Sequence, residues 1–201
     1  MDTVAVVPLK ALDRAKERLS PHLDAGARRA LAGWMLGRVI EACAGCRHVQ
    51  RVLVVAGDEH GAELAVAAGA EALLQPVPGL TASLDAADAM LAGAAATLVV
   101  AADLPLALAE DLERVVEAAP DGPAVVVAPT SDGGTAALYR RPGRVIGTAY
   151  GPGSADAHLS LARAAGAAGV RLHLPRLALD IDTPQQLAEW RSRFPASLPG
   201  A

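Results

Sequence analysis

Apolar runs of strand length alternate with helical stretches along the first two thirds of the chain. The expected strands cover Thr3–Pro8, Arg51–Ala56, Glu71–Gln75, Leu98–Ala101 and Ala124–Ala128. Helices are expected between them, at about residues 23–44, 63–68, 81–94 and 110–119. Connections of this kind join parallel strands by right-handed crossovers. The alternation therefore predicts an α/β fold, a three-layer α/β/α Rossmann-like sandwich around a mostly parallel sheet.

The composition supports one such domain over residues 1–201, with a short irregular tail from about residue 195. The chain is 52% hydrophobic but only 2% aromatic, so its core must be built from Ala, Val and Leu. A net charge of −4 gives no general basic surface for nucleic acid or membranes. No apolar run approaches the length of a membrane span, and the N-terminus lacks a signal-peptide pattern. We therefore expect a cytoplasmic protein without nucleic-acid or membrane partners.

The fourth expected strand ends in a carboxylate, Asp103, which Leu104 and Pro105 follow. Open α/β sheets bind ligands outside the carboxyl ends of their strands. Pro105 has no N–H and a fixed φ, so it ends the strand and turns the chain away. Asp103 is thus a candidate ligand-binding residue at the sheet edge. This stretch alone leaves open whether Asp103 merely caps the following helix.

The segment after the first strand, Leu9–Leu19, is rich in cations. Its basic residues are Lys10, Arg14, Lys16 and Arg18. Both lysines of the chain lie here, although 16 of its 18 basic residues are arginines. Ammonium groups are common partners of phosphate oxygens, so we favour phosphate binding over a solvated helix with Asp13 and Glu17 as ion-pair partners. No glycine-rich nucleotide motif follows the first strand, so this basic loop would have to take that role.

Two glycine clusters interrupt the alternation in the last third. The first, Gly133-Gly134-Thr135, precedes a short strand expected near Ala137–Tyr139. The second, Gly151-Pro152-Gly153-Ser154, precedes a helix at about residues 156–168 with His158 one turn into it. Glycine lets backbone N–H groups approach a ligand, and free N–H groups at a helix start bind anions. Together with the basic loop, these clusters predict a phosphate site, while a packing role for His158 stays open.

Near the end of the chain, the segment LDIDTP carries Asp180 and Asp182. Both point to the same face if the segment is extended. One of them is predicted to join Asp103 on a divalent metal, because magnesium takes carboxylate oxygens together with substrate phosphates.

Two hydroxyl–proline pairs are expected helix starts. Ser20-Pro21 precedes the first long helix, and Thr183-Pro184 precedes a closing helix through about residue 193. In each pair the hydroxyl residue would be the N-cap and proline the first helical residue.

Several of these motifs resemble one family. Pro8, Lys10 and the run Ala15–Ser20, AKERLS, are similar to the opening of the phospholactate/phosphoenolpyruvate guanylyltransferases of deazaflavin (factor 420) coenzyme biosynthesis. The D-L-P, G-G-T, G-P-G-S-x-x-x-H and D-I-D-T-P motifs look like that family's later motifs, in the same order over nearly the whole chain. D-L-P and D-x-D-T-P are shared with molybdenum-cofactor nucleotidyltransferases, so the opening and the glycine motifs carry the specificity.

The resemblance implies a nucleotidyltransferase-type sandwich that uses GTP and Mg²⁺. It implies transfer of GMP to the phosphate of phosphoenolpyruvate or 2-phospho-L-lactate, with release of pyrophosphate. Carried over by motif, the residues expected to contact the triphosphate are Lys10, Lys16 and Arg18. Those expected to hold the metal are Asp103 with Asp182 or Asp180. Those expected around the acceptor are Thr135, Gly134, Gly151, Ser154 and His158.

Two positions depart from the family pattern. Ala136 stands where the family usually has Asn, and Thr81 stands where it usually has Asn after Gly-Leu. Two alternatives stay open: a molybdopterin guanylyl- or cytidylyltransferase, and a catalytically silent nucleotide-binding module. Ala136 favours the silent module, whereas the intact lysines and aspartates favour an enzyme. The identity of the acceptor acid stays open, and 3-phosphoglycerate is a third candidate. The oligomeric state stays open too, with a homodimer as one possibility.

Overall fold

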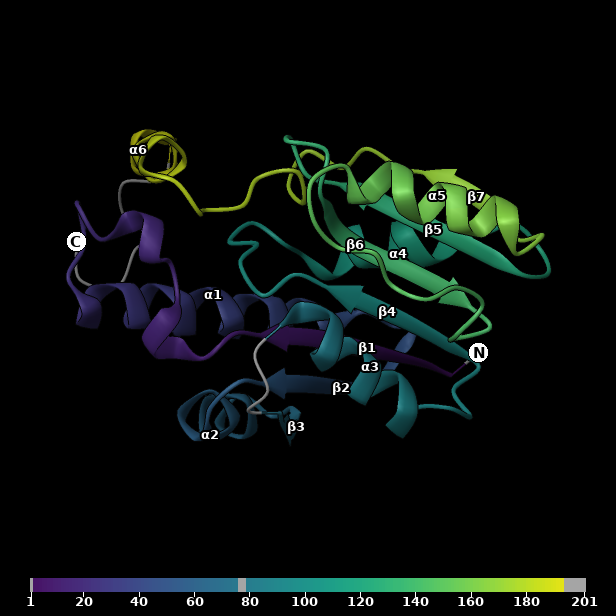
Figure 1. Ribbon diagram of the computed structural model, residues 1–201, viewed down its shortest axis with the longest axis horizontal. Helices are drawn as coiled ribbons and strands as arrows, with labels where there is room; N and C mark the ends of the chain where they lie inside the picture. Colours follow the sequence, from purple (N-terminus) through teal and green to yellow (C-terminus); the bar gives the residue numbers. More distant parts are fainter. Residues whose placement is uncertain (1, 76–78, 194–201) are drawn as a thin grey trace.

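A computed structural model describes residues 2–75 and 79–193 of the chain. Within these residues, the strands form one sheet in the order β3-β2-β1-β4-β6-β5-β7 (Figure 1). The strands are β1 (Thr3–Leu9), β2 (Val49–Ala56), β3 (Glu71–Leu74), β4 (Ala96–Val100), β5 (Ala124–Pro129), β6 (Thr135–Arg141) and β7 (Ala168–Arg171). Only β6 runs antiparallel to its neighbours in this sheet. The predicted mostly parallel sheet is confirmed.

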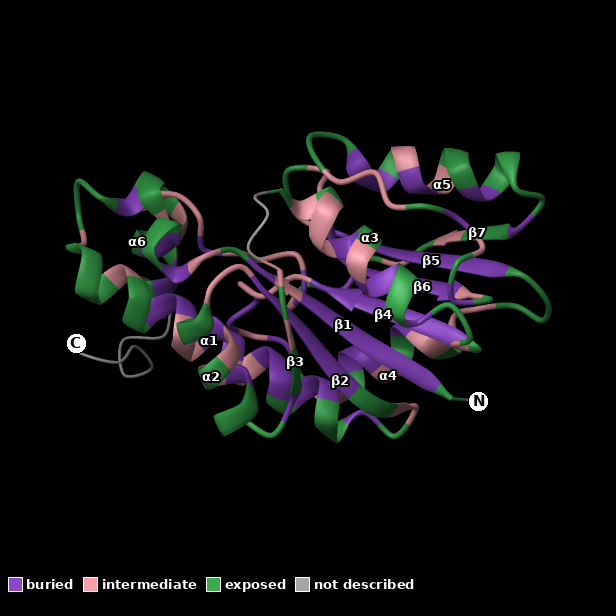
Figure 2. Cartoon of the chain, turned by 60° about the horizontal axis from the view of Figure 1, so that its bottom comes forward, coloured by how far each residue is buried: buried purple, intermediate pink, exposed green. Residues whose placement is uncertain are grey.

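Helices cover both faces of the sheet. They are α1 (Ala25–Gly45), α2 (Glu59–Ala67), α3 (Leu80–Met90), α4 (Ala109–Glu117), α5 (Ser154–Ala164) and α6 (Pro184–Arg193). Alternate residues of a strand point to opposite faces. Ala5 and Val7 of β1 therefore pack with α1 and α4, whereas Val4 and Val6 pack with α3 and α5. The central strands β1, β4, β5 and β6 are buried and the outer helix faces are exposed, which confirms the three predicted layers (Figure 2).

A third apolar cluster lies beyond the edge where β1 and β2 end (Figure 1). It joins the basic loop, α1, the segment before α6, and α6 itself. Its buried members are Leu19, Leu31, Met35, Ile181, Leu187 and Trp190. Trp34 meets Trp190 edge to face, with ring centroids 5.8 Å apart. This cluster therefore attaches the last described helix directly to the loop that carries the lysines.

Some expected boundaries were wrong. The first long helix begins at Ala25, because the carboxylate of Asp24 accepts the N–H of Ala27 and caps it. Ser20 instead ends a short 3₁₀ turn, Glu17–Leu19. The helix expected to reach residue 168 ends at Ala164, and β7 follows where no strand was expected. The residues of β7 are mostly exposed, so it lacks the apolar run that marks the central strands.

The start of α6 lies where the sequence predicted it. Thr183 is confirmed as a cap, since its hydroxyl accepts the N–H of Gln186 at 3.3 Å, and Pro184 is the first residue of α6. Residues 76–78 and the expected tail from about 195 lie outside the described residues. In the part of the chain that the structure describes, no helix combines the length and apolarity needed to cross a membrane.

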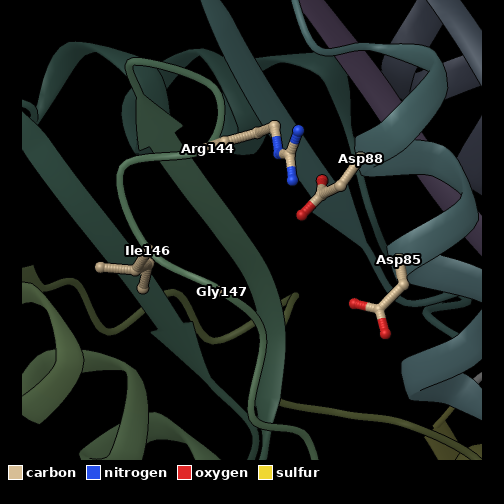
Figure 3. Close-up of a pocket in the computed structure, with 5 residues that line it drawn as sticks. All are labelled: Asp85, Asp88, Arg144, Ile146 and Gly147. Carbon is tan, nitrogen blue, oxygen red and sulfur yellow. The ribbon is translucent and has the colours of Figure 1, made fainter.

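A buried arginine ties β6 to α3. Arg140 is fully buried and donates to both carboxylate oxygens of Asp88, at 2.9 and 2.6 Å. It also donates to the Thr97 hydroxyl of β4 and to the Ile146 carbonyl of the loop after β6. Next to this ion pair lies a pocket of about 230 Å³ between α3 and that loop (Figure 3). The pair fixes the loop that leads on to the second glycine cluster.

Candidate functional site

The parallel strands β1 to β4 all end at one edge of the sheet. The antiparallel strand β6 begins at this edge, since Ala137 pairs with Val100 at the end of β4. The edge therefore gathers the loop after β1, the loop after β4 that carries Asp103, and the first glycine cluster before Thr135. The predicted site residues come mostly from these loops.

The basic loop folds into two 3₁₀ turns, Leu12–Arg14 and Glu17–Leu19. Leu12 and Leu19 are buried and anchor the loop on the domain. Lys16 lies between the two turns with φ 53° and ψ 38°, the only left-handed residue other than glycine among the described residues. For an L-residue, this conformation costs about 1 kcal/mol, so other contacts must hold it.

Lys16 is held by carboxylates from two distant parts of the chain. Its Nζ lies 2.6 Å from Oδ2 of Asp103 and 3.7 Å from Oδ1 of Asp182. The Lys16 side chain is only 8% exposed, whereas the side chains of Asp103 and Asp182 are 32% and 36% exposed. Arg18 reaches Oδ2 of Asp182 at 2.9 Å from a largely exposed position. The structure thus brings Lys16, Arg18, Asp103 and Asp182 together.

Two other predicted site residues, Lys10 and Asp180, form no ion pair in the part of the chain that the structure describes. Lys10 is exposed and makes no ion pair within the described residues, so its role stays a prediction. Asp180 is only partly exposed, and its pKa is raised by burial and by the nearby charge of Asp103. The positive charge of Lys16 acts in the opposite direction and lowers the pKa of Asp180.

The carboxylates fit a cation that arrives with a phosphate ligand. Among the described residues, no group of three or more His, Cys, Asp or Glu side chains is arranged to hold a metal ion by itself. Mg²⁺, however, is usually bound by one or two carboxylates together with substrate phosphates. Asp103 with Asp182 or Asp180 offers such a hard, incomplete set of oxygen donors.

The predicted acceptor residues form a buried hydrogen-bonded group. The hydroxyl oxygens of Thr135 and Ser154 lie 2.9 Å apart, and Thr135 Oγ1 lies 3.1 Å from Nδ1 of His158. The backbone N–H of Ala149 donates to Nε2 of His158 at 2.9 Å. His158 Nδ1 must therefore carry the proton and donate to Thr135. Both ring nitrogens serve contacts within the protein, which supports the packing interpretation of His158.

The glycine clusters lie against each other, because the N–H of Ala155 donates to the Gly133 carbonyl at 3.3 Å. Gly153 has φ 70° and stands at the N-cap position of α5. The expectation of free N–H groups at this helix start is wrong for the first turn. The N–H groups of Ser154 and Asp156 already donate to the carbonyls of Gly151 and Gly153. The Thr135 and Ser154 hydroxyls are buried polar groups between the two glycine clusters.

A second pocket, of about 580 Å³, opens beside the basic loop at the ends of β2 and β3. It is lined by Leu12, Asp13, Gly57, Asp58, Glu59, His60 and Leu74. Sequence reasoning missed Gly57 and Asp58. A side chain on Gly57 would come within 2.6 Å of the Ala11 nitrogen, and Asp58 accepts the N–H groups of Leu12 and Gly61. Gly57 and Asp58 directly follow a buried strand, and this position in the sequence could have identified them as residues of the ligand-binding edge.

The neutral state of His158 predicts a pH-dependent stability. Burial and the charge of Arg140 lower the pKa of His158 to about 4, against an ordinary value of 6.5. Between these values the unfolded chain binds a proton that the folded chain does not, so stability is full above pH 6.5 and is lost as pH falls towards 4. The expected loss from this residue is on the order of 2–3 kcal/mol. Urea unfolding from pH 7.5 to 4.5 measures it.

The control for this measurement is His158→Gln, which removes the titrating group. Carboxylates also destabilise the protein in acid, so the difference between the two pH profiles isolates the histidine. Parallel profiles would contradict the assignment of a neutral His158.

Comparison with known proteins gives one family. A family model described as "Guanylyl transferase CofC like" matches residues 3–191. The phosphoenolpyruvate guanylyltransferase of Sphaerobacter thermophilus is 38% identical over 197 residues, which are 97% of this chain and 95% of that protein. The enzyme of the same name from Rubrobacter xylanophilus is 40% identical over 94% of this chain and 93% of its own. The 3-phospho-D-glycerate guanylyltransferase of Colwellia psychrerythraea is 31% identical over 93% and 90%.

Solved structures agree on the fold. A nucleotidyl transferase from Methanothermobacter thermautotroptrophicus superimposes with a TM-score of 0.61 at 18% identity, over 96% of this chain and 97% of that one. A 4-diphosphocytidyl-2C-methyl-D-erythritol synthase gives 0.63 at 15% identity, over 95% and 97%. The sheet and its helices are therefore those of nucleotidyltransferases.

Proposed function

Because this chain belongs to the CofC-like guanylyl transferase family, we propose that it transfers GMP from GTP to the phosphate of phosphoenolpyruvate in deazaflavin coenzyme biosynthesis. The observation that carries the proposal is the meeting of Lys16, Asp103 and Asp182 at one sheet edge. Cations suited to a triphosphate and carboxylates suited to Mg²⁺ stand there side by side. The proposal places the reaction in the cytoplasm, with small molecules as its substrates.

The reaction needs charge neutralisation and positioning more than a general base. A phosphate monoester has its second pKa near 6, so at neutral pH it is mostly a dianion and already a nucleophile. One of its oxygens forms a bond to the α-phosphorus of GTP, and the bond from that phosphorus to the β-phosphate oxygen breaks. The electron pair of the broken bond leaves with pyrophosphate. Bound Mg²⁺ would neutralise and orient the phosphates of GTP.

The predicted site residues have different roles in this proposal, according to the loop that carries them. Lys16 and Arg18, with Lys10 from the same loop, would contact the triphosphate and stabilise the negative charge on the transferring group. Asp103 with Asp182 or Asp180 would hold Mg²⁺. The pocket of about 580 Å³ beside this loop is the place for the guanine nucleoside.

The acceptor acid is assigned to the other side of the edge. The Thr135 and Ser154 hydroxyls, with the backbone of Gly134 and Gly151, would bind its phosphate and carboxylate. His158 would keep Thr135 in place through their hydrogen bond. Of the three relatives described above, two are named for phosphoenolpyruvate and one for 3-phospho-D-glycerate, so the test compares acceptor acids.

The test is pyrophosphate release from GTP and Mg²⁺ with each of phosphoenolpyruvate, 2-phospho-L-lactate and 3-phosphoglycerate. We expect the highest kcat/KM with phosphoenolpyruvate. Ser154→Ala should raise the KM of the acid without a matching rise in the KM of GTP. If GTP binds but no acid supports release, the protein is a nucleotide-binding module and the enzymatic proposal fails.

A further inference from the structure

The turn between β2 and α2 holds the beginning of the basic loop. The N–H of Gly57 donates to the Leu9 carbonyl at 2.9 Å, at the point where β1 and β2 end. Oδ2 of Asp58 accepts the N–H of Leu12 at 2.5 Å. These two contacts lie on either side of Lys10 in the sequence. They therefore fix the backbone that carries this lysine.

The loop also passes directly over Gly57. A Cβ at this position would lie 2.6 Å from the backbone nitrogen of Ala11 and 3.2 Å from the carbonyl carbon of Lys10. Real Cβ atoms do not approach backbone atoms this closely, so only glycine admits the loop here. The contact between turn and loop is thus made largely by backbone.

Asp58 uses both of its carboxylate oxygens, at the starts of two different helical turns. Its Oδ1 accepts the N–H of Gly61 at 2.7 Å and caps α2. Its Oδ2 accepts the first N–H of the 3₁₀ turn Leu12–Arg14 in the basic loop. The cap of α2 needs only one oxygen, and serine or asparagine could supply it. The second oxygen of the carboxylate serves the loop.

The two lysines of the loop are held in different ways. Lys16 is nearly buried, and its ammonium group lies between the carboxylates of Asp103 and Asp182. Lys10 is exposed and has no ion-pair partner in the part of the chain that the structure describes. The direction in which Lys10 leaves the loop therefore depends on the backbone that Asp58 holds.

We propose that Asp58 is a positioning residue, which fixes the backbone around Lys10 so that the Lys10 ammonium group meets the triphosphate of GTP. This inference rests on the proposed function. Through space, the carboxylate of Asp58 repels a triphosphate. Any gain in GTP affinity from Asp58 must then act through the loop. A loop that is ordered before GTP binds loses less conformational freedom on binding.

The experiment measures the affinity for Mg²⁺–GTP by isothermal titration calorimetry, without any acceptor acid. In Asp58→Ser, the hydroxyl can still cap α2 through Gly61 but cannot also accept the N–H of Leu12. Asp58→Asn is a second variant, with the same shape but only one acceptor oxygen. The matched control is Asp24→Ser, which makes the same change at the exposed N-cap of α1. Thermal unfolding checks that all three variants are folded.

Loss of a negative charge alone would tighten GTP binding in all three variants. We expect the opposite at Asp58: both variants should bind Mg²⁺–GTP about tenfold more weakly, in keeping with the loss of one hydrogen bond to a charged group. Asp24→Ser should stay within about twofold of the wild type. The KM of the acceptor acid should also change by less than about twofold in the Asp58 variants, whereas general damage to the fold would raise the KM of both substrates.

Double variants show whether Asp58 acts through Lys10. In a Lys10→Met background, Asp58→Ser should add less than about a twofold further loss, because the two residues contribute through one contact. In a Lys16→Met background, Asp58→Ser should still cost about tenfold, because Lys16 has its own carboxylate partners.

Tight binding of Mg²⁺–GTP by Asp58→Ser, equal to that of the wild type, would overturn this inference and leave the proposed function standing. An equal loss in Asp24→Ser, or a full tenfold loss in the Lys10→Met background, would do the same. Failure of the wild-type protein to bind Mg²⁺–GTP at all would overturn the proposed function, and this inference with it.

Discussion

Replacement of Asp103 by asparagine should lower the rate of pyrophosphate release at least about 1,000-fold while the protein stays folded. Asparagine has nearly the same shape but no charge, so it loses both the attraction for Mg²⁺ and the ion pair with Lys16 at 2.6 Å. Asp103 is about one third exposed, and the nearly buried Lys16 keeps a second carboxylate, Asp182 at 3.7 Å, when Asp103 loses its charge. The loss should therefore fall on turnover and hardly on stability.

The matched control for this variant is Asp121→Asn. Asp121 is exposed and precedes β5 at the opposite edge of the sheet, where no site residue lies. Its activity should remain within about twofold of the wild type, as is usual for exposed positions. Circular dichroism and thermal unfolding report the folded state of both proteins. More than a tenth of wild-type activity in Asp103→Asn would remove Asp103 from the site.

Lys16→Met should lower kcat at least about 100-fold, with a smaller change in the KM of GTP. The Lys16 ammonium group is nearly buried between carboxylates, so it meets the triphosphate with little water left to screen it. Lys16→Arg should restore little activity, because a planar guanidinium does not fit the space of a compact ammonium group. Initial rates at varied GTP concentration separate kcat from KM.

Arg14→Met is the control for Lys16, because it removes one positive charge from the same loop at an exposed position. Its kcat should stay within about threefold of the wild type. Lys16→Gly separates backbone from charge, since glycine adopts a positive φ without strain. A Lys16→Gly protein as active as the wild type would show that the charge is unnecessary, and would contradict the assignment.

The fold was predictable where the sequence repeats a simple physical pattern. Strands buried on both faces are continuous apolar runs, and the runs of β1, β2, β4 and β5 are unmistakable. Asp103 could be placed because a charge directly after such a run must lie at the sheet edge. The start of α6 could be placed because Thr183-Pro184 has a specific capping geometry.

Other features could not be predicted because they depend on contacts distant in sequence. The direction of β6 is set by its neighbours, and this reversal brings Thr135 to the same edge as Asp103. The left-handed backbone of Lys16 follows from partners 87 and 166 residues away, Asp103 and Asp182. The sequence pattern placed the N-cap of the first long helix at Ser20. The residue that caps this helix is Asp24, only four residues further on, and both residue types are common N-caps.

The cluster of Leu19, Ile181 and Trp190 also bears on the order in which the protein is made. Ribosomes release a chain from its first residue onwards, and the strands of the sheet are complete once residue 171 has emerged. Asp180, Asp182 and the helix that holds them follow later, and they dock on a loop made at the very beginning. A nascent chain can thus shape its sheet early, yet the carboxylates beside Lys16 are assembled only near the end of synthesis.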